Sequence, residues 1–357
     1  MTVQAEGPTR LEAVGSVAVR TFEARRTGTN PETQAPQAMA QYEDELQDSQ
    51  LYDPDAEYEP DPEYAATLAP DAARQRRERV GPTGRPLPYF PIPGPLTEHG
   101  PAKIVAMCNQ KGGVGKTTST INLGAALAEY GRRVLLVDFD PQGALSVGLG
   151  VNPMELDITV YNLLMERGLV ADDVLLKTAV PGMDLLPSNI DLSAAEVQLV
   201  SEVARESTLQ RALKPLMSDY DYIVIDCQPS LGLLTVNALT AAHTVIVPLE
   251  CEFFALRGVA LLTETIEKVR ERLNPELELD GILATMYDSR TVHSREVLAR
   301  VVEAFDDNVF HTVIGRTVRF PETTVAGEPI TTYASNSVGA AAYRQLAREV
   351  LARCHAE

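Results

Sequence analysis

From residue 102 onward, short runs of apolar residues alternate with longer stretches in which apolar residues recur at helical spacing. The short runs are apolar almost throughout, a pattern typical of strands buried on both faces of a parallel sheet. Strands are therefore predicted over residues 103–108, 133–140, 222–227, 243–250 and 281–288. The amphipathic stretches between them predict helices, including those over residues 117–130, 194–216 and 255–273. Such alternation predicts an α/β fold with a doubly wound, mostly parallel sheet and helices on both faces.

The first 100 residues lack this alternation. Residues 43–63 hold ten acidic side chains and no basic one, and a cluster of arginines at 74–79 and a Pro-rich stretch at 82–95 follow. Such a segment buries too little apolar surface to offset its ordering entropy. We expect residues 1–100 to form a disordered arm, with a short helix at 65–79, and residues 101–357 to form the folded domain. The arm is either a solubilising tail or a docking segment for a partner, and composition does not separate the two.

The composition narrows the classes of protein. The chain has 357 residues, a formal net charge of -19 and four cysteines far apart in the sequence, with no Cys-x-x-Cys pair. This spacing does not indicate a zinc ribbon or a redox motif, and a reduced, cytosolic setting is the plain interpretation. The sequence shows no secretory signal and no run of 18 apolar residues, so no membrane association is expected. The acidity argues against coating DNA through overall charge, but it allows a local basic patch.

A glycine-rich loop follows the first predicted strand and opens the first predicted helix. Residues 111–118 read KGGVGKTT, and a loop in this context can turn its backbone N–H groups toward phosphate oxygens. Lys116 would supply charge to the β- and γ-phosphates, and the Thr117 hydroxyl would ligate Mg²⁺. Gln110 stands where the general pattern has glycine. The candidate residues for binding ATP or ADP are Lys111, Gly112, Gly113, Val114, Gly115, Lys116, Thr117 and Thr118.

Acidic side chains stand at the ends of two predicted strands. The segment DFDPQG places Asp138 and Asp140 at the end of one strand, and Asp226 ends the strand YIVID. Ligands of open α/β sheets bind at the carboxyl ends of the strands. A carboxylate there can hold Mg²⁺ through water, because Mg²⁺ keeps several of its waters. Thr117, Asp138 and Asp226 are therefore the candidate metal residues.

These motifs resemble those of the deviant Walker A ATPases, and most closely the ParA/Soj partition ATPases, a group of P-loop NTPases. The resemblance spans residues 102–354 and is carried by NQKGGVGKTTSTINLGAALA, VLLVDFDPQGALSVGLG, PSLGLLTVNAL, TMYDSRT and TVIGRTVRF. It implies an ATP-dependent homodimer in which Lys111, the family's signature lysine, contacts the partner's nucleotide. It also implies that Asp140 orients the attacking water, so that Lys111, Lys116 and Asp140 are the catalytic candidates. Slow ATP hydrolysis stimulated by a ParB-like centromere-binding protein would complete the cycle.

The resemblance also implies a DNA-binding surface. Arg290 and Arg319 occupy positions at which the ParA branch contacts non-specific double-stranded DNA, and Arg316 is expected to extend the patch, as is Arg295. The protein is accordingly expected in the cytoplasm, associated with the nucleoid. The MinD branch binds membrane through a basic C-terminal helix, whereas the apolar stripe in the last helix here indicates core packing.

Two alternatives stay open on the sequence. One is an orphan positioning or scaffold ATPase that serves a condensation or polar complex instead of partition. The other is a metabolic amide ligase with a similar loop, which the DPQG segment and the arginines disfavour. Three features depart from the ParA pattern, namely the segment Cys227-Gln228-Pro229 after the strand-end Asp226, Gly315 near the expected adenine site, and the length of the arm.

Overall fold

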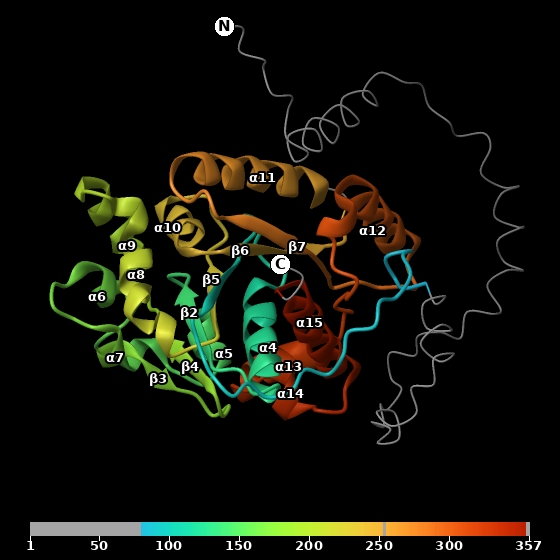
Figure 1. The fold of residues 1–357 in the computed structure, drawn as a ribbon, viewed down its shortest axis with the longest axis horizontal. Coiled ribbons are helices and arrows are strands. Elements are labelled where there is room, and N and C mark those ends of the chain that lie inside the picture. Colours follow the sequence, from blue (N-terminus) through green and yellow to red (C-terminus); the bar gives the residue numbers. More distant parts are fainter. Residues whose placement is uncertain (1–79, 253–254, 355–357) are drawn as a thin grey trace, which may run out of the picture.

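A computed structural model describes residues 80–252 and 255–354 of the chain (Figure 1). Its centre is one seven-stranded sheet with the strand order β3-β4-β2-β5-β1-β6-β7. All neighbouring strands are parallel except β3 and β4, which are antiparallel. The strands are β1 (Lys103–Met107), β2 (Val134–Phe139), β3 (Leu176–Lys177), β4 (Met183–Leu186), β5 (Tyr222–Cys227), β6 (Thr244–Glu250) and β7 (Glu278–Thr285).

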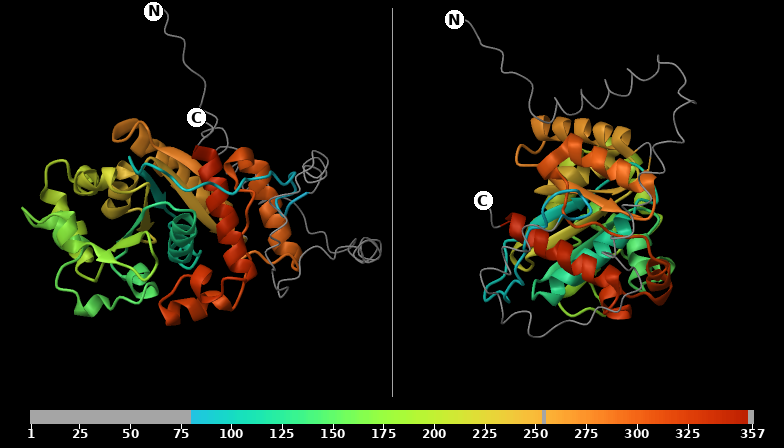
Figure 2. Two further views of the ribbon diagram at one scale, coloured as in Figure 1. Left: turned by 60° about the horizontal axis from the view of Figure 1, so that its bottom comes forward. Right: turned by 90° about the vertical axis from the view of Figure 1, so that its right-hand side faces the viewer.

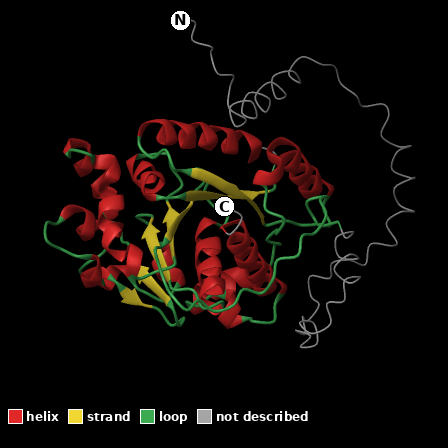
Figure 3. Cartoon of the chain, in the orientation of Figure 1, coloured by secondary structure: helices red, strands yellow, loops and turns green. Residues whose placement is uncertain are grey.

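Helices cover both faces of the sheet (Figure 3). The longer ones are α4 (Lys116–Glu129), α10 (Leu233–Ala241), α11 (Ala255–Arg272), α12 (Val292–Phe305), α13 (Arg319–Ala326) and α15 (Val338–Cys354). The shorter ones are α5 (Ala144–Gly148), α6 (Val160–Met165), α7 (Ala171–Val174), α8 (Leu192–Gln198), α9 (Thr208–Leu213) and α14 (Ile330–Tyr333). The predicted doubly wound α/β fold is confirmed. No helix in the described part of the chain is both long enough and apolar enough to cross a membrane.

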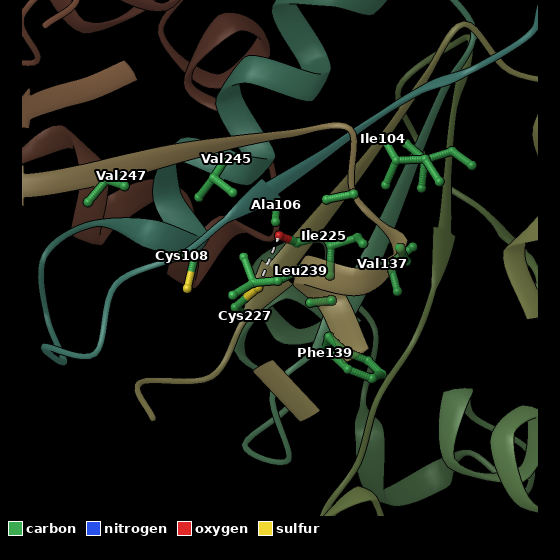
Figure 4. Packing of buried hydrophobic residues seen from close by; sticks show 14 of the residues in the cluster. Ile104, Ala106, Cys108, Val137, Phe139, Ile225, Cys227, Leu239, Val245 and Val247 are labelled. Carbon is green, nitrogen blue, oxygen red and sulfur yellow. Dashed lines mark hydrogen bonds between the residues drawn. The ribbon is translucent and has the colours of Figure 1, made fainter. Parts of the chain in front are cut away.

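The core consists of two layers, one on each face of the sheet. Alternate residues of β2 divide between them, with Leu135 and Val137 in one cluster and Val134 and Leu136 in the other. The first cluster includes residues of α10, α11 and α12, and the second includes residues of α4 and α15. Figure 4 shows Cys108 and Cys227 among the apolar side chains of the first cluster, and both thiols are buried and free. Their surroundings agree with a structural role.

The predicted strands are observed, with shifts at their ends. Residues 222–227 form β5 as predicted, whereas the last strand ends at Thr285 and not at 288, because Met286 has a positive φ of 50° that breaks the extended backbone. The single helix predicted over residues 194–216 is wrong. There α8 ends at Gln198, the backbone turns at Ala204 with φ 54°, and α9 begins at Thr208. The short strands β3, at the edge of the sheet, and β4, between β3 and β2, were not predicted.

Residues 80–100 pack against the domain. Arg85 donates to the carbonyl oxygens of Asp306 at 2.8 Å and of Val309 at 2.6 Å, and Arg132 donates to the carbonyl of Gly94 at 2.6 Å. In Figure 1 this segment is the blue trace that runs along the α4 and α15 side of the domain, and Figure 2 shows it from two other directions. The expectation of disorder up to residue 100 therefore does not hold for residues 80–100, because guanidinium–carbonyl hydrogen bonds attach them. The acidic run and the helix expected at 65–79 lie outside the described residues.

One carboxylate joins the end of this segment to the sheet. Asp221 accepts hydrogen bonds from His99 Nδ1 at 2.7 Å, from the Gly100 amide at 2.9 Å and from the Arg133 amide at 2.7 Å. Burial alone would raise its pKa, but the Arg133 amide, His99 and the Gly100 amide together hold the pKa below its usual range. The charged form is therefore favoured in the folded protein.

We predict that Asp221→Asn lowers the free energy of unfolding by about 1–3 kcal/mol at pH 7, the usual range for a hydrogen-bonded charged group. Because the folded pKa of Asp221 is depressed, its contribution is complete above the unfolded value near 4 and is lost as the pH falls through the folded pKa. Urea unfolding at pH 7 and near pH 3 measures both values. Asp219→Asn, at the exposed neighbouring carboxylate, is the matched control and should change little.

Candidate functional site

The glycine-rich loop lies between β1 and α4, as the sequence predicted. Helix α4 begins at Lys116, and Gly115 precedes it with a left-handed φ of 84°. A Cβ atom added at Gly112 or Gly113 would meet no atom within 4 Å, so open space adjoins the loop. The first turn of α4 has no acidic side chain, and Gly115 provides no side-chain cap. Its unpaired N–H groups and the positive end of its dipole are thus available to an anion.

Side chains near two strand ends and one at the start of α4 hold the loop. Asn109, two residues after the end of β1, accepts from the Lys111 amide at 2.9 Å and donates to the Pro248 carbonyl in β6 at 2.7 Å. Thr285, the last residue of β7, donates to the Val114 carbonyl at 2.8 Å. The Lys116 ammonium donates to the Lys111 carbonyl at 3.1 Å. Asn109 and Thr285 were not predicted as site residues, although each is a polar residue at the end of an apolar strand.

Two buried carboxylates lie beside the loop. Strands β2 and β5 are neighbours, and Asp138 is directly paired with Asp226 in their register. Asp226 accepts from the Thr117 hydroxyl at 2.6 Å. Asp138 accepts from the Ser146 amide at 2.8 Å and from the Ser146 hydroxyl at 2.7 Å. The structure therefore brings the three candidate metal residues to one place, with one oxygen of Asp138 already engaged by Ser146 at the start of α5.

Burial and mutual repulsion disfavour negative charge on this pair. Burial, and to a lesser degree the nearby Asp138, raise the pKa of Asp226 to about 8, against the hydrogen bond from Thr117 and the charge of Lys116. Burial likewise raises the pKa of Asp138 to about 7, against its hydrogen bonds from Ser146. A cation beside the two carboxylates would favour their charged forms.

The residues at this place fit Mg²⁺. Their donors are hydroxyl and carboxylate oxygens, which this hard cation prefers, and they lie next to the open loop where phosphate oxygens would complete the shell. No group of three or more His, Cys, Asp or Glu side chains suited to a metal occurs in the described part of the chain. This agrees with Mg²⁺, which is commonly held by one or two protein ligands together with phosphate and water.

Asp140 follows the end of β2 and is half-buried. Its carboxylate accepts from the Gln142 amide at 2.9 Å, and its own amide donates to Asp138 at 3.4 Å. Gly143 continues this turn with a left-handed φ of 62° and leads into α5. Asp140 thus begins the turn after β2, two residues beyond Asp138, and its amide contacts the Asp138 carboxylate.

Lys111 forms ion pairs within its own chain. Its ammonium lies 3.0 Å from a carboxylate oxygen of Glu250, the last residue of β6, and 2.6 Å from one of Glu252. The other oxygen of Glu250 lies 3.4 Å from the Arg316 guanidinium. In this single chain the Lys111 side chain is therefore associated with carboxylates of its own subunit.

The candidate DNA-binding arginines come from two adjoining segments. Backbone hydrogen bonds from Tyr287 to Ile314 and from Arg316 to Tyr287, each 3.0 Å, hold the segments side by side. Arg290, Arg316 and Arg319 are all exposed. Each forms an ion pair with an acidic side chain. Arg290 pairs with Asp288 at 3.0 Å and Arg319 pairs with Glu322 at 3.1 Å. Arg316 pairs with Glu250. The segments provide an exposed cluster of arginines whose charge is partly balanced locally.

Gln228, noted above as an unusual residue, is buried just beyond Asp226. Its amide nitrogen donates to the Glu196 carboxylate of α8 at 2.9 Å. The loop after β5 is thereby tied to α8, a contact that the sequence pattern did not predict. Gly315, the other unusual residue, pairs through its backbone with Tyr287.

Comparisons with known proteins agree with this geometry. A family model described as an AAA domain matches residues 102–279. The chain is 47% identical over 250 residues to the sporulation initiation inhibitor protein Soj of Bacillus subtilis, covering 70% of this chain and 98% of Soj. It is 65% identical over 300 residues to an uncharacterized protein of Mycobacterium tuberculosis, covering 84% of this chain and 93% of that protein. This match is longer than residues 101–357, so it includes part of the N-terminal region.

Among solved structures, a cobyrinic acid a,c-diamide synthase of Mycobacterium smegmatis with bound ADP and magnesium is similar, with a TM-score of 0.64. It is 46% identical to this chain, and the match covers 71% of this chain and 96% of that one. The similarity extends over nearly all of the nucleotide-bound protein.

We predict that Thr285→Val weakens nucleotide binding about 5- to 50-fold. The substitution nearly preserves shape but leaves the buried Val114 carbonyl without its donor, and such a loss commonly costs about 1–3 kcal/mol. Titration of a fluorescent ADP analogue with Mg²⁺ measures the change. Thr265→Val, at a hydroxyl that bonds only to the Leu261 carbonyl of its own helix, is the matched control. An affinity equal to the control's would show that the loop does not depend on β7.

Proposed function

This chain belongs to the ParA/Soj family of P-loop ATPases, and we propose that it is a DNA-binding partition ATPase that acts as an ATP-dependent homodimer. Its activity is ATP hydrolysis, and its cofactors are ATP or ADP and Mg²⁺, in agreement with the nucleotide-bound relative. The observation that carries the proposal is the meeting of the KGGVGKTT loop with Asp226 and Asp138 at adjacent strand ends. The partition role itself is inferred from the relatives named for it.

The proposed nucleotide contacts follow the loop. The backbone N–H groups of residues 112–118 would bind phosphate oxygens, and the Lys116 ammonium would exchange the Lys111 carbonyl for the β- and γ-phosphates. When bound, Mg²⁺ offsets the charge of the phosphates. Thr117 and Asp226 would hold it, and Asp138 would orient its water shell while keeping Ser146 in place.

Hydrolysis and dimer closure are assigned to two further residues. Asp140, in the turn beside the carboxylate pair, would orient the attacking water. Lys111 would reach the nucleotide of the other subunit and so complete its site. Turnover is slow in phosphoryl transfer when part of the charge stabilisation of the transition state is missing until a partner arrives. A ParB-like protein is the partner we propose.

The proposed DNA surface consists of Arg290, Arg316 and Arg319. A few cationic contacts in each subunit give weak, salt-sensitive binding, because every neutralised phosphate releases counterions. Dimerisation doubles the contacts and makes the second set effectively intramolecular, so ATP switches DNA affinity without base-specific contacts. In the cell this would place the dimer in the cytoplasm on the nucleoid.

A second candidate is an orphan positioning ATPase that retains the nucleotide switch but serves another complex. The local pairing of all three arginines with carboxylates favours it, since these contacts lower the attraction for phosphate.

The name of the M. smegmatis structure points to a third candidate, amide synthesis. Taking nitrogen from glutamine requires a reactive nucleophile such as an activated cysteine. In the described part of the chain, Cys108, Cys227 and Cys251 are buried, and burial raises the pKa of Cys251 to about 12. Cys354 is partly buried and accepts a hydrogen bond from Tyr222 at the start of β5, the opposite end of that strand from Asp226. The burial of three cysteines and the position of the fourth disfavour amide synthesis.

We predict that the protein binds non-specific double-stranded DNA with ATP but not with ADP or without nucleotide. Arg290→Glu/Arg319→Glu should abolish this binding while ATP-dependent dimerisation persists, because the two arginines pair with Asp288 and Glu322 and are not among the proposed nucleotide contacts. Fluorescence anisotropy over a range of salt concentrations measures affinity and slope, and Arg272→Glu at the end of α11 is the matched control. Dimers that form with ATP but do not bind DNA would favour the orphan ATPase.

We also predict that Asp140→Ala lowers ATP turnover by at least about tenfold while retaining ATP binding. The reason is that the carboxylate is proposed to act on the attacking water and not on the nucleotide. Phosphate release and ATP affinity, measured on the same preparation, separate the two effects. Unchanged turnover would remove Asp140 from the mechanism, and lost binding would reveal a structural role for its turn.

A further inference from the structure

The side chain of Lys111 lies between two carboxylates of its own subunit. Glu250 is fixed at the end of β6 and its side chain is only 14% exposed, whereas the Glu252 side chain, two residues later, is 54% exposed. The Lys111 side chain itself is 45% exposed. One ammonium is thus shared by two carboxylates at the edge of the nucleotide site.

The Lys111 backbone is fixed, so only its side chain can move. Its amide is bound by Asn109 and its carbonyl by Lys116. A cavity of about 400 Å³ adjoins the ion pairs, with Lys111, Glu250, Arg257 and Leu261 in its lining. The ammonium therefore has space to leave its two partners without any change in the loop.

We propose that Glu250 and Glu252 are positioning residues that retain the Lys111 ammonium within its own subunit and thereby oppose closure of the ATP dimer. The inference rests on the proposed function, in which Lys111 acts across the dimer. Contact with the other subunit's nucleotide and contact with the two glutamates exclude each other, because one short ammonium group cannot reach both. Glu250 and Glu252 would thereby set the protein concentration and the nucleotide occupancy at which dimers form.

The contacts favour the charged forms of Lys111 and Glu252. Partial burial would lower the pKa of Lys111, but hydrogen bonds to Glu252 and Glu250 outweigh it and the net shift is upward. The hydrogen bond from Lys111 lowers the pKa of Glu252. Exposed ion pairs are individually weak, so this restraint adjusts the equilibrium and does not block it.

Glu250 also connects this restraint to the arginine surface. Its second oxygen lies 3.4 Å from Arg316, while Glu252 pairs with Lys111. When Lys111 leaves, Glu250 retains Arg316 as its cationic partner. The two glutamates therefore differ in their expected effects, because Glu250 forms ion pairs with both Lys111 and Arg316, whereas Glu252 pairs with Lys111 and acts on Arg316 only through its charge.

The test measures dimerisation of the full chain with ATPγS and Mg²⁺ by sedimentation velocity over a range of protein concentrations. We expect Glu252→Gln to lower the concentration for half-dimerisation about threefold and Glu250→Gln/Glu252→Gln about tenfold. Glu252→Asp, which keeps the charge, should lie closer to wild type. The matched control is Glu264→Gln, which removes one charge from an exposed ion pair with Lys268 on α11 and should change nothing. Thermal unfolding of each variant verifies the fold.

DNA affinity of the preformed dimers separates the two glutamates. Glu250→Gln should strengthen DNA binding by freeing Arg316, and Glu252→Gln should strengthen it less, because Glu252 forms no ion pair with Arg316. If the double variant dimerises no more readily than Glu264→Gln while Lys111→Ala prevents dimerisation, the restraint is refuted and the proposed function stands. If Lys111→Ala dimerises like wild type, the role of Lys111 across the dimer is refuted, and the restraint with it.

Discussion

Negative charge buried at the carboxyl ends of β2 and β5 is the constraint on which the rest of the site depends. Asp138 and Asp226 are adjacent in the sheet, and both are removed from water. Carboxylates so placed repel one another and bear a desolvation cost, which donors such as Thr117 and Ser146 offset only in part. A divalent cation with its phosphate ligands is the natural counter-charge. The surrounding structure can be understood as an arrangement that presents such a cation to the pair.

The strand order makes this arrangement possible. Strand β5 lies between β1 and β2, so the loop that leaves β1 and the turn that leaves β2 flank Asp226 from either side. Asn109 and Thr285 then attach the loop to β6 and β7. Strands β1, β5, β6 and β7 thereby hold the glycine-rich loop in a defined position. A preformed loop loses less conformational entropy when it binds phosphate.

Charge at the exposed edge of the site is organised differently. Lys111, Glu250, Glu252 and Arg316 form a network of ion pairs in which only the Glu250 side chain is largely shielded from solvent. Surface ion pairs are weak, so such a network can rearrange when a nucleotide or a second subunit arrives. In the proposed function, the buried carboxylates would provide a fixed cation site and this network an adjustable contact surface.

The sequence by itself determined the α/β class, the central strands and the KGGVGKTT loop, because apolar runs and glycine-rich turns are local patterns with direct structural consequences. It also identified Asp138, Asp140 and Asp226 as strand-end residues. Local pattern failed at residues 194–216, where the positive φ of Ala204 interrupts a helical periodicity, and at the short strands β3 and β4. Only the tertiary structure decided that Thr285 supports Val114 and that Gln228 bonds to Glu196. It also decided that residues 80–100 pack on the domain. The position of Lys111 between Glu250 and Glu252 was likewise visible only in the folded chain. These contacts join residues far apart in the chain, so they depend on strand order and packing, which no local pattern encodes.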